Sequence, residues 1–560
     1  MSTTATMTET PGAPGARRWF GLAALVTGMF VSQIDFFMLN VALPTIRRDL
    51  SASLAEIQLI AVAYGVTYAT TVIAGGRLGD LFGRRRLFLW GMAGLGAASL
   101  LGGLAWSGWV LVAARVLQGC AAGAMSPQTI GSVHAMFPGR GRDRAFAILG
   151  AVTGAAWAGG IVLGGVVVGA NLAGLGWRAI LLIKLPLIAA VLAGGYLFVG
   201  ESHPPRGSRL DLPGMTTLSV IVGLIIVPLI EGPDLGWPWW TFLALALAGC
   251  AVPLLVRIER RTLRSGRSPL LSPQLFADRT FRTGLLLNAV FFLGPPAFFL
   301  LTQLYLQDVE DFSPYRASMF LLPFGIGVVL ASYAVNWLKQ RVGDRVILFG
   351  IAVMFTGLAT LLLFVEHSGS GLNVAHTAPS VTLIGIGQGL VTTPLSELLL
   401  RNIAKEIAST ASAVFRTVQL LSQALSVVVL VIVFGVVAGW QVSAALPAQT
   451  ARLRQVELAA GASPSQAARA ADSLRSCVRR AAPQLSSGAS VSCAHAATPA
   501  ANARLEHAAQ RAVADAIRRS YVRTMLVNLA VILATGAIAA ITMRRARRRH
   551  TNERGGSGSP

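Results

Sequence analysis

The chain has 560 residues, of which 54% are hydrophobic and only 13% are charged. Its mean hydropathy of +0.62 excludes a soluble globular protein and indicates a chain that lies in a lipid bilayer. The formal net charge of +23 does not indicate nucleic-acid binding, because the basic residues lie between apolar segments and form no single amphipathic surface.

A membrane-spanning helix needs about 20 predominantly apolar residues, because no backbone polar group can stay unpaired in hydrocarbon. The sequence contains fourteen such runs and so predicts an all-α polytopic membrane protein with 14 spans. The predicted spans are 19–43, 55–78, 87–106, 109–132, 145–170, 178–199, 213–231, 239–257, 281–306, 316–338, 345–365, 377–399, 406–439 and 523–543.

Arginine and lysine gather in the short loops after the second, fourth, eighth, tenth and fourteenth spans, which all fall on one side of the membrane. Because such loops stay in the cytoplasm, both termini are predicted to be cytoplasmic in a multi-pass protein of the plasma (inner) membrane. The long, arginine-rich segment 440–522 falls on the other side, and long loops are translocated largely regardless of charge.

Two weak internal repeats predict a duplicated architecture. Residues 76–87 align with 336–347, and 117–126 align with 387–396. The predicted organisation is a cytoplasmic tail 1–18, a six-helix bundle 19–200, two inserted transmembrane helices with cytoplasmic linkers 201–280, a second six-helix bundle 281–543 that contains the extracytoplasmic loop 440–522, and a basic cytoplasmic tail 544–560.

Four motifs stand in order along the first half: DFFMLNVALP (35–44), GRLGDLFGRR (76–85), RVLQG (115–119) and WRAILLIKLP (177–186). With them, nearly the whole chain resembles the fourteen-spanning drug:proton antiporter group of the major facilitator superfamily. The resemblance implies the major facilitator fold and a secondary active transporter, of the multidrug efflux permease type. Such a transporter exports small amphipathic compounds (drugs, antibiotics or related metabolites) in exchange for protons by alternating access.

The loop at 76–85 is predicted to act as a cytoplasmic latch between the two halves, formed by Gly76, Asp80, Gly83, Arg84 and Arg85. The glycines allow a tight turn and close helix approach, and the Asp80 carboxylate can accept charge-assisted hydrogen bonds. The alternative is that the arginines serve only to orient the chain in the membrane.

Proton coupling requires an acid that meets two environments in turn, and Asp35 is the best candidate. At 1.5 Å per residue, Asp35 lies ~12 Å and Arg115 ~9 Å from the outer interface, so the two can interact. The resemblance implicates the first-helix acid and the fourth-helix arginine in proton and substrate transfer. The alternative is a static ion pair that only joins the two helices.

Two positions depart from the pattern of that family. Lys184 stands where asparagine is usual, and it either extends to the outer interface or joins Asp35 and Arg115, which would leave a net positive cluster and favour anionic or neutral cargo. In the fifth helix the glycines Gly160, Gly164 and Gly165 remain for close packing, but the family's proline is absent. Antiport is therefore less firmly implied than the fold.

Polar side chains within the apolar spans are candidates for the substrate cavity. They are Asn40, Gln118, Lys184, Asn288, Gln303, Gln388, Arg416 and Gln419. The GPP sequence at 294–296 is expected to bend the ninth span.

The loop 440–522 is predicted to form short alanine-rich helices broken by Pro447, Pro464 and Pro483, stapled by a disulfide between Cys477 and Cys493. Three roles are expected for this loop as alternatives: it binds an outer accessory partner, it covers the exit of the transport path, or it is a passive spacer. Cys120 and Cys250 are expected to be buried packing residues.

No Ser–His–Asp arrangement, metal-ligand spacing or phosphate-binding loop is present, so neither an enzyme nor a metal or other cofactor is predicted. The expected partners are the lipid bilayer, small-molecule cargo and protons, and the chain is expected to be a monomer. A proton-independent facilitator and a sensor or binding protein derived from a transporter are the alternatives.

Overall fold

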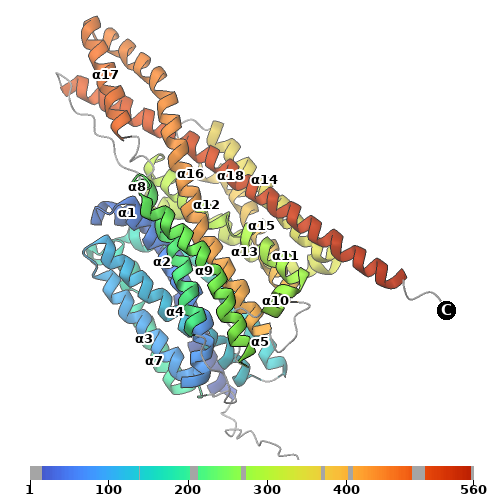
Figure 1. Ribbon diagram of the computed structural model, residues 1–560. Coiled ribbons are helices and arrows are strands. Elements are labelled where there is room, and N and C mark those ends of the chain that lie inside the picture. The colour runs from blue at the N-terminus through green and yellow to red at the C-terminus, as the bar shows by residue number, and fades with distance from the viewer. Residues whose placement is uncertain are drawn as a thin grey trace, which may run out of the picture.

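The computed structural model describes residues 15–137, 139–201, 212–265, 273–367, 372–400, 408–481 and 499–555. Within these ranges all the regular structure is helical, and most helices run side by side in one elongated bundle (Figure 1). The all-α prediction is therefore confirmed.

The N-terminal helices are α1 (Gly15–Leu50), α2 (Leu54–Phe82), α3 (Arg84–Gly103), α4 (Gly108–Met136), α5 (Gly139–Ala170), η1 (Leu172–Gly174), α6 (Arg178–Leu182) and α7 (Leu185–Phe198). Helix α4 packs on α2 and α3, and α1 packs on α5 and α7. The start of α2 is fixed locally, because Ser53 and Glu56 form a capping box across its first turn.

The predicted sixth span is two helices, α6 and α7, which are separated at Ile183 and Lys184. The cause is Pro186, which stands in the first turn of α7 and supplies no amide hydrogen to continue the helix. Lys184 therefore lies at the break, as the residue before α7 begins.

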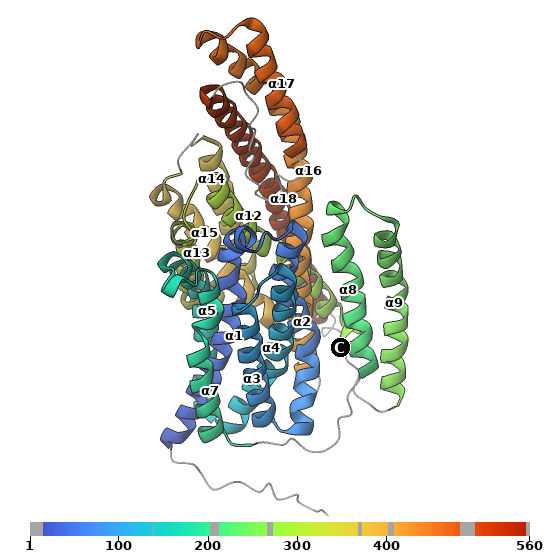
Figure 2. The same cartoon turned by 90° about the vertical axis from the view of Figure 1, so that its left-hand side faces the viewer.

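The next two helices, α8 (Leu212–Asp234) and α9 (Trp239–Arg264), form a hairpin at one side of the bundle (Figure 2). Helix α8 contacts α2 and α16. The outer face of α9 exposes Trp239, Phe242, Leu243 and Leu247, which is the surface expected of a helix in contact with lipid.

The C-terminal helices are α10 (Pro273–Ala277), α11 (Arg279–Phe291), α12 (Pro295–Asp308), α13 (Pro314–Val342), η2 (Gly343–Arg345), α14 (Val346–His367), α15 (Val374–Leu400), α16 (Ala408–Ala459), α17 (Pro464–Ala481) and α18 (Pro499–Gly555). The expected bend at GPP is present, because α11 ends at Phe291 and α12 begins at Pro295. Helices α13 and α14 pack on α15, while α5 packs on α13 and α2 on α16.

Two of these helices are much longer than a bilayer is thick. Helix α16 has 52 residues and α18 has 57, and at 1.5 Å per residue a 52-residue helix extends ~78 Å against a hydrocarbon core of ~30 Å. Together with α17 they project beyond the bundle (Figures 1 and 2). Arg504 of α18 donates from Nε and Nη2 to the two carboxylate oxygens of buried Glu457, each at 2.9 Å, and so ties the projection together.

This projection corrects the prediction for 440–522. Pro447 does not break a helix, because it lies within α16, whose helical turns continue to Ala459 on packing against α17 and α18. Pro464 starts α17, and Pro483 lies outside the described residues. The predicted C-terminal tail is also helical as far as Gly555.

Within the described residues, nine helical segments are long and apolar enough to cross a membrane. A shorter apolar stretch, Thr216–Leu229, lies in α8. A multi-pass membrane protein is therefore confirmed, and the number of fourteen spans stays a prediction.

Candidate functional site

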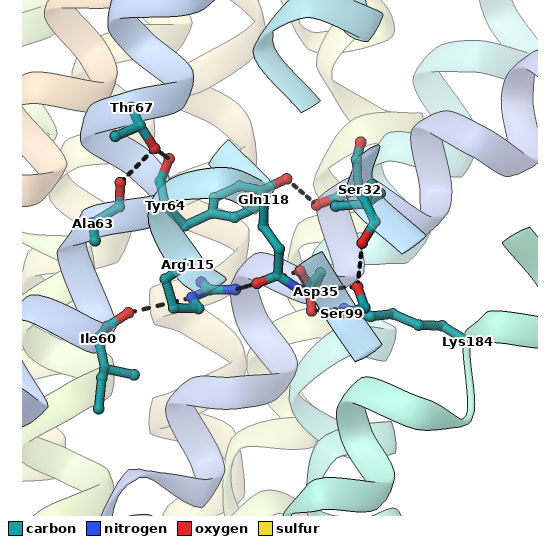
Figure 3. Close-up of polar contacts among 11 residues, drawn as sticks. Ser32, Asp35, Ile60, Ala63, Tyr64, Thr67, Ser99, Arg115, Gln118 and Lys184 are labelled. Carbon is teal, nitrogen blue, oxygen red and sulfur yellow. Dashed lines mark hydrogen bonds and ion pairs between the residues drawn. The ribbon is translucent and has the colours of Figure 1, made fainter. Parts of the chain in front are cut away.

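A charged cluster lies inside the N-terminal helices, where α1, α4 and the break between α6 and α7 meet (Figure 3). Arg115 Nη1 of α4 donates to Asp35 Oδ2 of α1 at 3.3 Å. Lys184 Nζ forms an ion pair with the other carboxylate oxygen, Asp35 Oδ1. The side chains of Asp35 and Arg115 are 0% exposed and that of Lys184 is 6% exposed, so solvent does not screen the three charges.

Neutral groups complete the surroundings of Arg115. Its Nη1 also donates to Gln118 Oε1 at 3.1 Å, and its Nε donates to the Ile60 carbonyl at 3.3 Å. The guanidinium carbon lies 4.6 Å from the centre of the Tyr64 ring of α2, a cation–π contact. Gln118 Nε2 donates to Ser99 Oγ of α3 at 2.9 Å, so four N-terminal helices position the charged cluster (Figure 3).

The cluster carries two cations and one anion, which is one positive charge in excess. Arg115 Nη2 is buried and makes no hydrogen bond within the described part of the chain. An uncompensated buried charge costs several kcal/mol, so this arrangement needs a reason. Of the two placements considered for Lys184, the structure has the one in which it joins Asp35 and Arg115.

Asp35 is closed off from solvent in this conformation, since its side chain is 0% exposed. A cavity of about 30 Å³, roughly the volume of one water molecule, lies between α1, α2, α12 and α16. Its lining residues are Asn40, Ala61, Val62, Gly65, Pro295, Pro296, Phe299, Leu300, Leu420, Gln423, Ala424 and Val427. Ligand sites usually enclose ~300 Å³ or more, so this cavity is too small in the present conformation to hold a drug-sized molecule.

The predicted cavity residues therefore fall into different places. Asn40 lines the small cavity, whereas Gln118 and Lys184 belong to the charged cluster. Asn288 Nδ2 donates to the Phe415 carbonyl at 3.1 Å, which joins α11 to α16.

The four remaining candidates lie among the C-terminal helices, where Gln303, Gln388 and Gln419 are buried and Arg416 is half-buried. Gln303 accepts a hydrogen bond of 2.9 Å from Gln307 Nε2, and Arg416 Nη1 donates to Gln419 Oε1 at 3.0 Å. Gln388 is 1% exposed, and neither its amide oxygen nor its nitrogen is hydrogen-bonded to a described residue. Such polar atoms are costly unless another conformation or a ligand pairs them.

The loop at 76–85 makes its described contacts with the N-terminal helices. Gly83 has a φ of +94°, and a Cβ there would lie 2.6 Å from a carboxylate oxygen of Glu201. That carboxylate accepts from the backbone N–H groups of Arg85 at 3.0 Å and Arg86 at 3.3 Å, which caps the first turn of α3. Arg84 Nη1 donates to the Gly131 carbonyl of α4 at 3.1 Å.

For two residues of the predicted latch, Asp80 and Gly76, the described contacts do not reach the other half of the molecule. The side chain of Asp80 lies outside the described residues, so its contact with the other half stays a prediction. At Gly76 an added Cβ would meet only Pro127 Cβ of α4, at 3.8 Å, which is an ordinary contact.

The fifth-helix glycines lie where α5 meets other helices. A Cβ on Gly164 would lie 2.6 Å from the Met38 carbonyl oxygen of α1, and one on Gly165 would lie 2.7 Å from the Pro314 carbonyl oxygen of α13. Gly160 is buried in the same helix. Close approach of α5 to α1 and α13 thus depends on the absence of side chains at 164 and 165.

Sequence reasoning missed two acidic residues with clear structural roles. Asp49, at the end of α1, accepts hydrogen bonds from Trp177 Nε1 at 2.9 Å and Arg178 Nη1 at 2.5 Å, so the first two residues of the sixth-helix motif bind to α1. Glu201 caps α3 from a segment that follows α7. Neither acid belongs to a motif, and only the neighbouring arginines could have suggested them.

The cysteines only partly follow expectation. Cys250 is exposed and Cys120 is half-buried, so the expectation of two buried packing residues is wrong for Cys250, which lies on the outer face of α9. Cys477 of α17 is disulfide-bonded. Cys493 lies outside the described residues, and its pairing with Cys477 stays a prediction.

The sequence matches the Major Facilitator Superfamily over residues 25–427, and the chain belongs to that family. Among solved structures, a bacterial homologue of the human lysosomal transporter Spinster, in an inward-facing and occupied conformation, aligns with a TM-score of 0.60 and 15% identity over 95% of this chain and 98% of that one. At this identity the likeness concerns the fold alone.

Sequence relatives narrow the class to transporters of the drug-efflux type. The chain is 34% identical to a probable actinorhodin transporter of Streptomyces coelicolor, over 94% of this chain and 92% of the relative. It is 32% identical to a puromycin resistance protein of Streptomyces alboniger, over 74% and 82%. It is 33% identical to the multidrug resistance protein Stp of Mycobacterium tuberculosis, over 70% and 71%.

Proposed function

We propose that this protein exports small amphipathic compounds in exchange for protons by alternating access. Relatives named as an actinorhodin transporter, a puromycin resistance protein and a multidrug resistance protein support the export of such compounds. The observation that carries the coupling mechanism is the buried ion-paired cluster of Asp35, Arg115 and Lys184. Intramembrane charges are rare because they are costly, and in transporters they mark proton and substrate pathways.

In this proposal, Asp35 exchanges the proton as the helices around it rearrange. Its carboxylate is enclosed here and paired with both cations, so it must lose at least one of them to reach water. Rearrangement of α1 relative to α4 or of the break at Lys184 would do this. Proton uptake would then release Arg115, whose Nη2 already lacks a partner among the described groups.

We further propose that the excess positive charge affects which cargo is accepted. A cavity that opens towards two cations and one carboxylate favours neutral or anionic amphipathic compounds over lipophilic cations. The small cavity lined by Asn40, Phe299 and Gln423 is the point from which such a site would open. Its walls are mostly apolar, which suits amphipathic cargo.

The arrangement in the membrane belongs to the same proposal. Helices α1–α7 would form one bundle, α11–α16 with α18 the other, and the hairpin α8–α9 would be inserted between them in sequence. Both termini would lie in the cytoplasm, with the α17 projection outside the plasma membrane. Alternating access would rock the two bundles about the contacts of α5 with α13 and of α2 with α16.

The test is efflux of an amphipathic dye from vesicles with and without an imposed proton gradient. Wild-type protein should respond to the gradient, whereas Asp35→Asn should lose the response while still exchanging labelled for unlabelled dye. Asp472→Asn is the matched control, because it replaces the same acid by the same amide at an exposed position on the projection. If Asp35→Asn keeps the wild-type gradient response, Asp35 is structural and the coupling proposal is wrong.

Two alternatives give different outcomes in the same vesicles. A proton-independent facilitator would exchange dye in every variant and never respond to the gradient. A sensor would bind dye without exchanging it.

A further inference from the structure

A groove of about 500 Å³ lies between α14 and α18, away from the charged cluster and the small cavity. The two helices pack side by side at the edge of the bundle (Figure 1). The lining residues are Ala359, Leu362, Leu363 and Glu366 of α14, and Arg518, Arg519, Val522, Arg523, Leu526 and Leu529 of α18. The groove therefore combines a polar and an apolar end.

The two ends follow one another along α18. On α18, Arg518 and Arg519 stand about two turns before Leu526, in the direction of the α17 projection. The leucine end is open at the surface, because Leu363 is 56% and Leu526 is 51% exposed. A cationic end followed by exposed leucine matches the polarity of a phospholipid molecule, with its charged headgroup and apolar acyl chains.

The charge at the polar end is positive. Three arginines and one carboxylate, Glu366, line the groove. Arg518 Nη2 lies 3.4 Å from Asp515 Oδ1, so part of its charge is matched by that acid, and the balance including Asp515 is still positive. Arg519 is exposed, and no hydrogen bond or ion pair joins it to another described residue.

Arg523 is held in place from a third helix. With the amide oxygen of Gln441 turned towards α18, that oxygen lies within hydrogen-bond distance of all three guanidinium nitrogens of Arg523: Nη1 at 2.5 Å, Nε at 3.1 Å and Nη2 at 3.3 Å. The guanidinium keeps further N–H groups for an anion, since arginine has five such donors. A planar guanidinium is the side chain best suited to bind two phosphate oxygens at once.

We propose that this groove binds an anionic phospholipid of the leaflet on the side of the α17 projection. Arg519 and Arg523 hold the headgroup phosphate, and Leu363 and Leu526 lie along an acyl chain. A zwitterionic lipid satisfies the phosphate contacts but brings its own cation to a site that already has an excess of positive charge. Free phosphate lacks the chain that the leucine end accommodates.

The experiment measures lipid retention by native mass spectrometry of the full chain, purified in detergent and titrated with phosphatidylglycerol. Each arginine near an anionic lipid contributes enough for about a fivefold change, so Arg519→Gln/Arg523→Gln should weaken retention about thirtyfold. Phosphatidylcholine should be retained much more weakly by wild-type protein, and inorganic phosphate should not compete at equal concentration.

The matched control is Arg454→Gln/Arg469→Gln, which removes two exposed arginines from the α16 and α17 part of the projection. It should keep wild-type retention of phosphatidylglycerol. If the double groove variant does not fold, Arg519→Gln alone serves, with an expected loss of about fivefold. Equal retention of phosphatidylglycerol by the wild-type and the groove variants, equal retention of phosphatidylcholine, or effective competition by inorganic phosphate would each overturn the proposal.

Discussion

The charged cluster predicts an unusual order of stabilities for its variants. Asp35→Asn leaves Arg115 and Lys184 as neighbouring buried cations without a counter-charge, and loss of one partner of a buried ion pair costs about 3–5 kcal/mol. Lys184→Asn removes the excess cation and leaves Asp35 paired with Arg115 at 3.3 Å. It should cost no more than the ~1 kcal/mol that is typical of a point substitution.

The double variant Asp35→Asn/Lys184→Asn then separates pairing from packing. It keeps one buried cation in place of two and should be more stable than Asp35→Asn alone, with a coupling of about 1–3 kcal/mol. The assay is the free energy of unfolding in mixed detergent micelles, followed by circular dichroism for all three variants. If Asp35→Asn is as stable as wild type, or if the single effects simply add, the three charges do not interact as the geometry implies.

Three further predictions concern other parts of the molecule. Gly165→Ala places a Cβ 2.7 Å from the Pro314 carbonyl oxygen, so it should lower the free energy of unfolding by about 1–3 kcal/mol and slow transport. Gly159→Ala, whose Cβ meets nothing within 4 Å, should do neither. Equal thermal unfolding and equal efflux rates for the two variants would contradict the close α5–α13 contact. Glu201→Gln removes the charge that caps α3 and should destabilise the protein by about 1 kcal/mol in thermal unfolding. An unchanged midpoint temperature of unfolding would show that the cap contributes nothing to stability. Cys477→Ser should destabilise the α17 projection by about 3 kcal/mol. Reducing agent should speed hydrogen exchange of α17 in wild-type protein and have no effect in this variant. If reducing agent still speeds exchange in the variant, the Cys477 disulfide is not what stabilises α17.

Much of the fold could be predicted, because hydrocarbon admits few structures. Apolar runs of about 20 residues must be helices, so the all-α class and the positions of α1–α5 follow from hydropathy alone. The bend at GPP also follows, since Pro295 and Pro296 cannot continue α11. The same rule failed at Pro447, where packing of α16 against α17 and α18 outweighs the loss of one hydrogen bond.

The candidate site was predicted less completely, because contacts between distant residues leave no local pattern. The pairing of Asp35 with Arg115 was expected from their similar depth, and the position of Lys184 was one of two possibilities. The break that brings Lys184 to Asp35 results from Pro186, two residues further on. Glu201 lies more than 100 residues from the amides it caps, so sequence spacing gave no indication of that contact.

The central claim is that Asp35 links proton movement to export, and proton flux tests it most directly. Proteoliposomes with an internal pH-sensitive dye are given cargo on one side, and the pH change is followed together with cargo movement. Wild-type protein should move protons in fixed ratio to cargo, while Asp35→Asn should exchange cargo with no pH change. Cargo transport without proton movement in the wild type, or an unchanged ratio in Asp35→Asn, would contradict the claim.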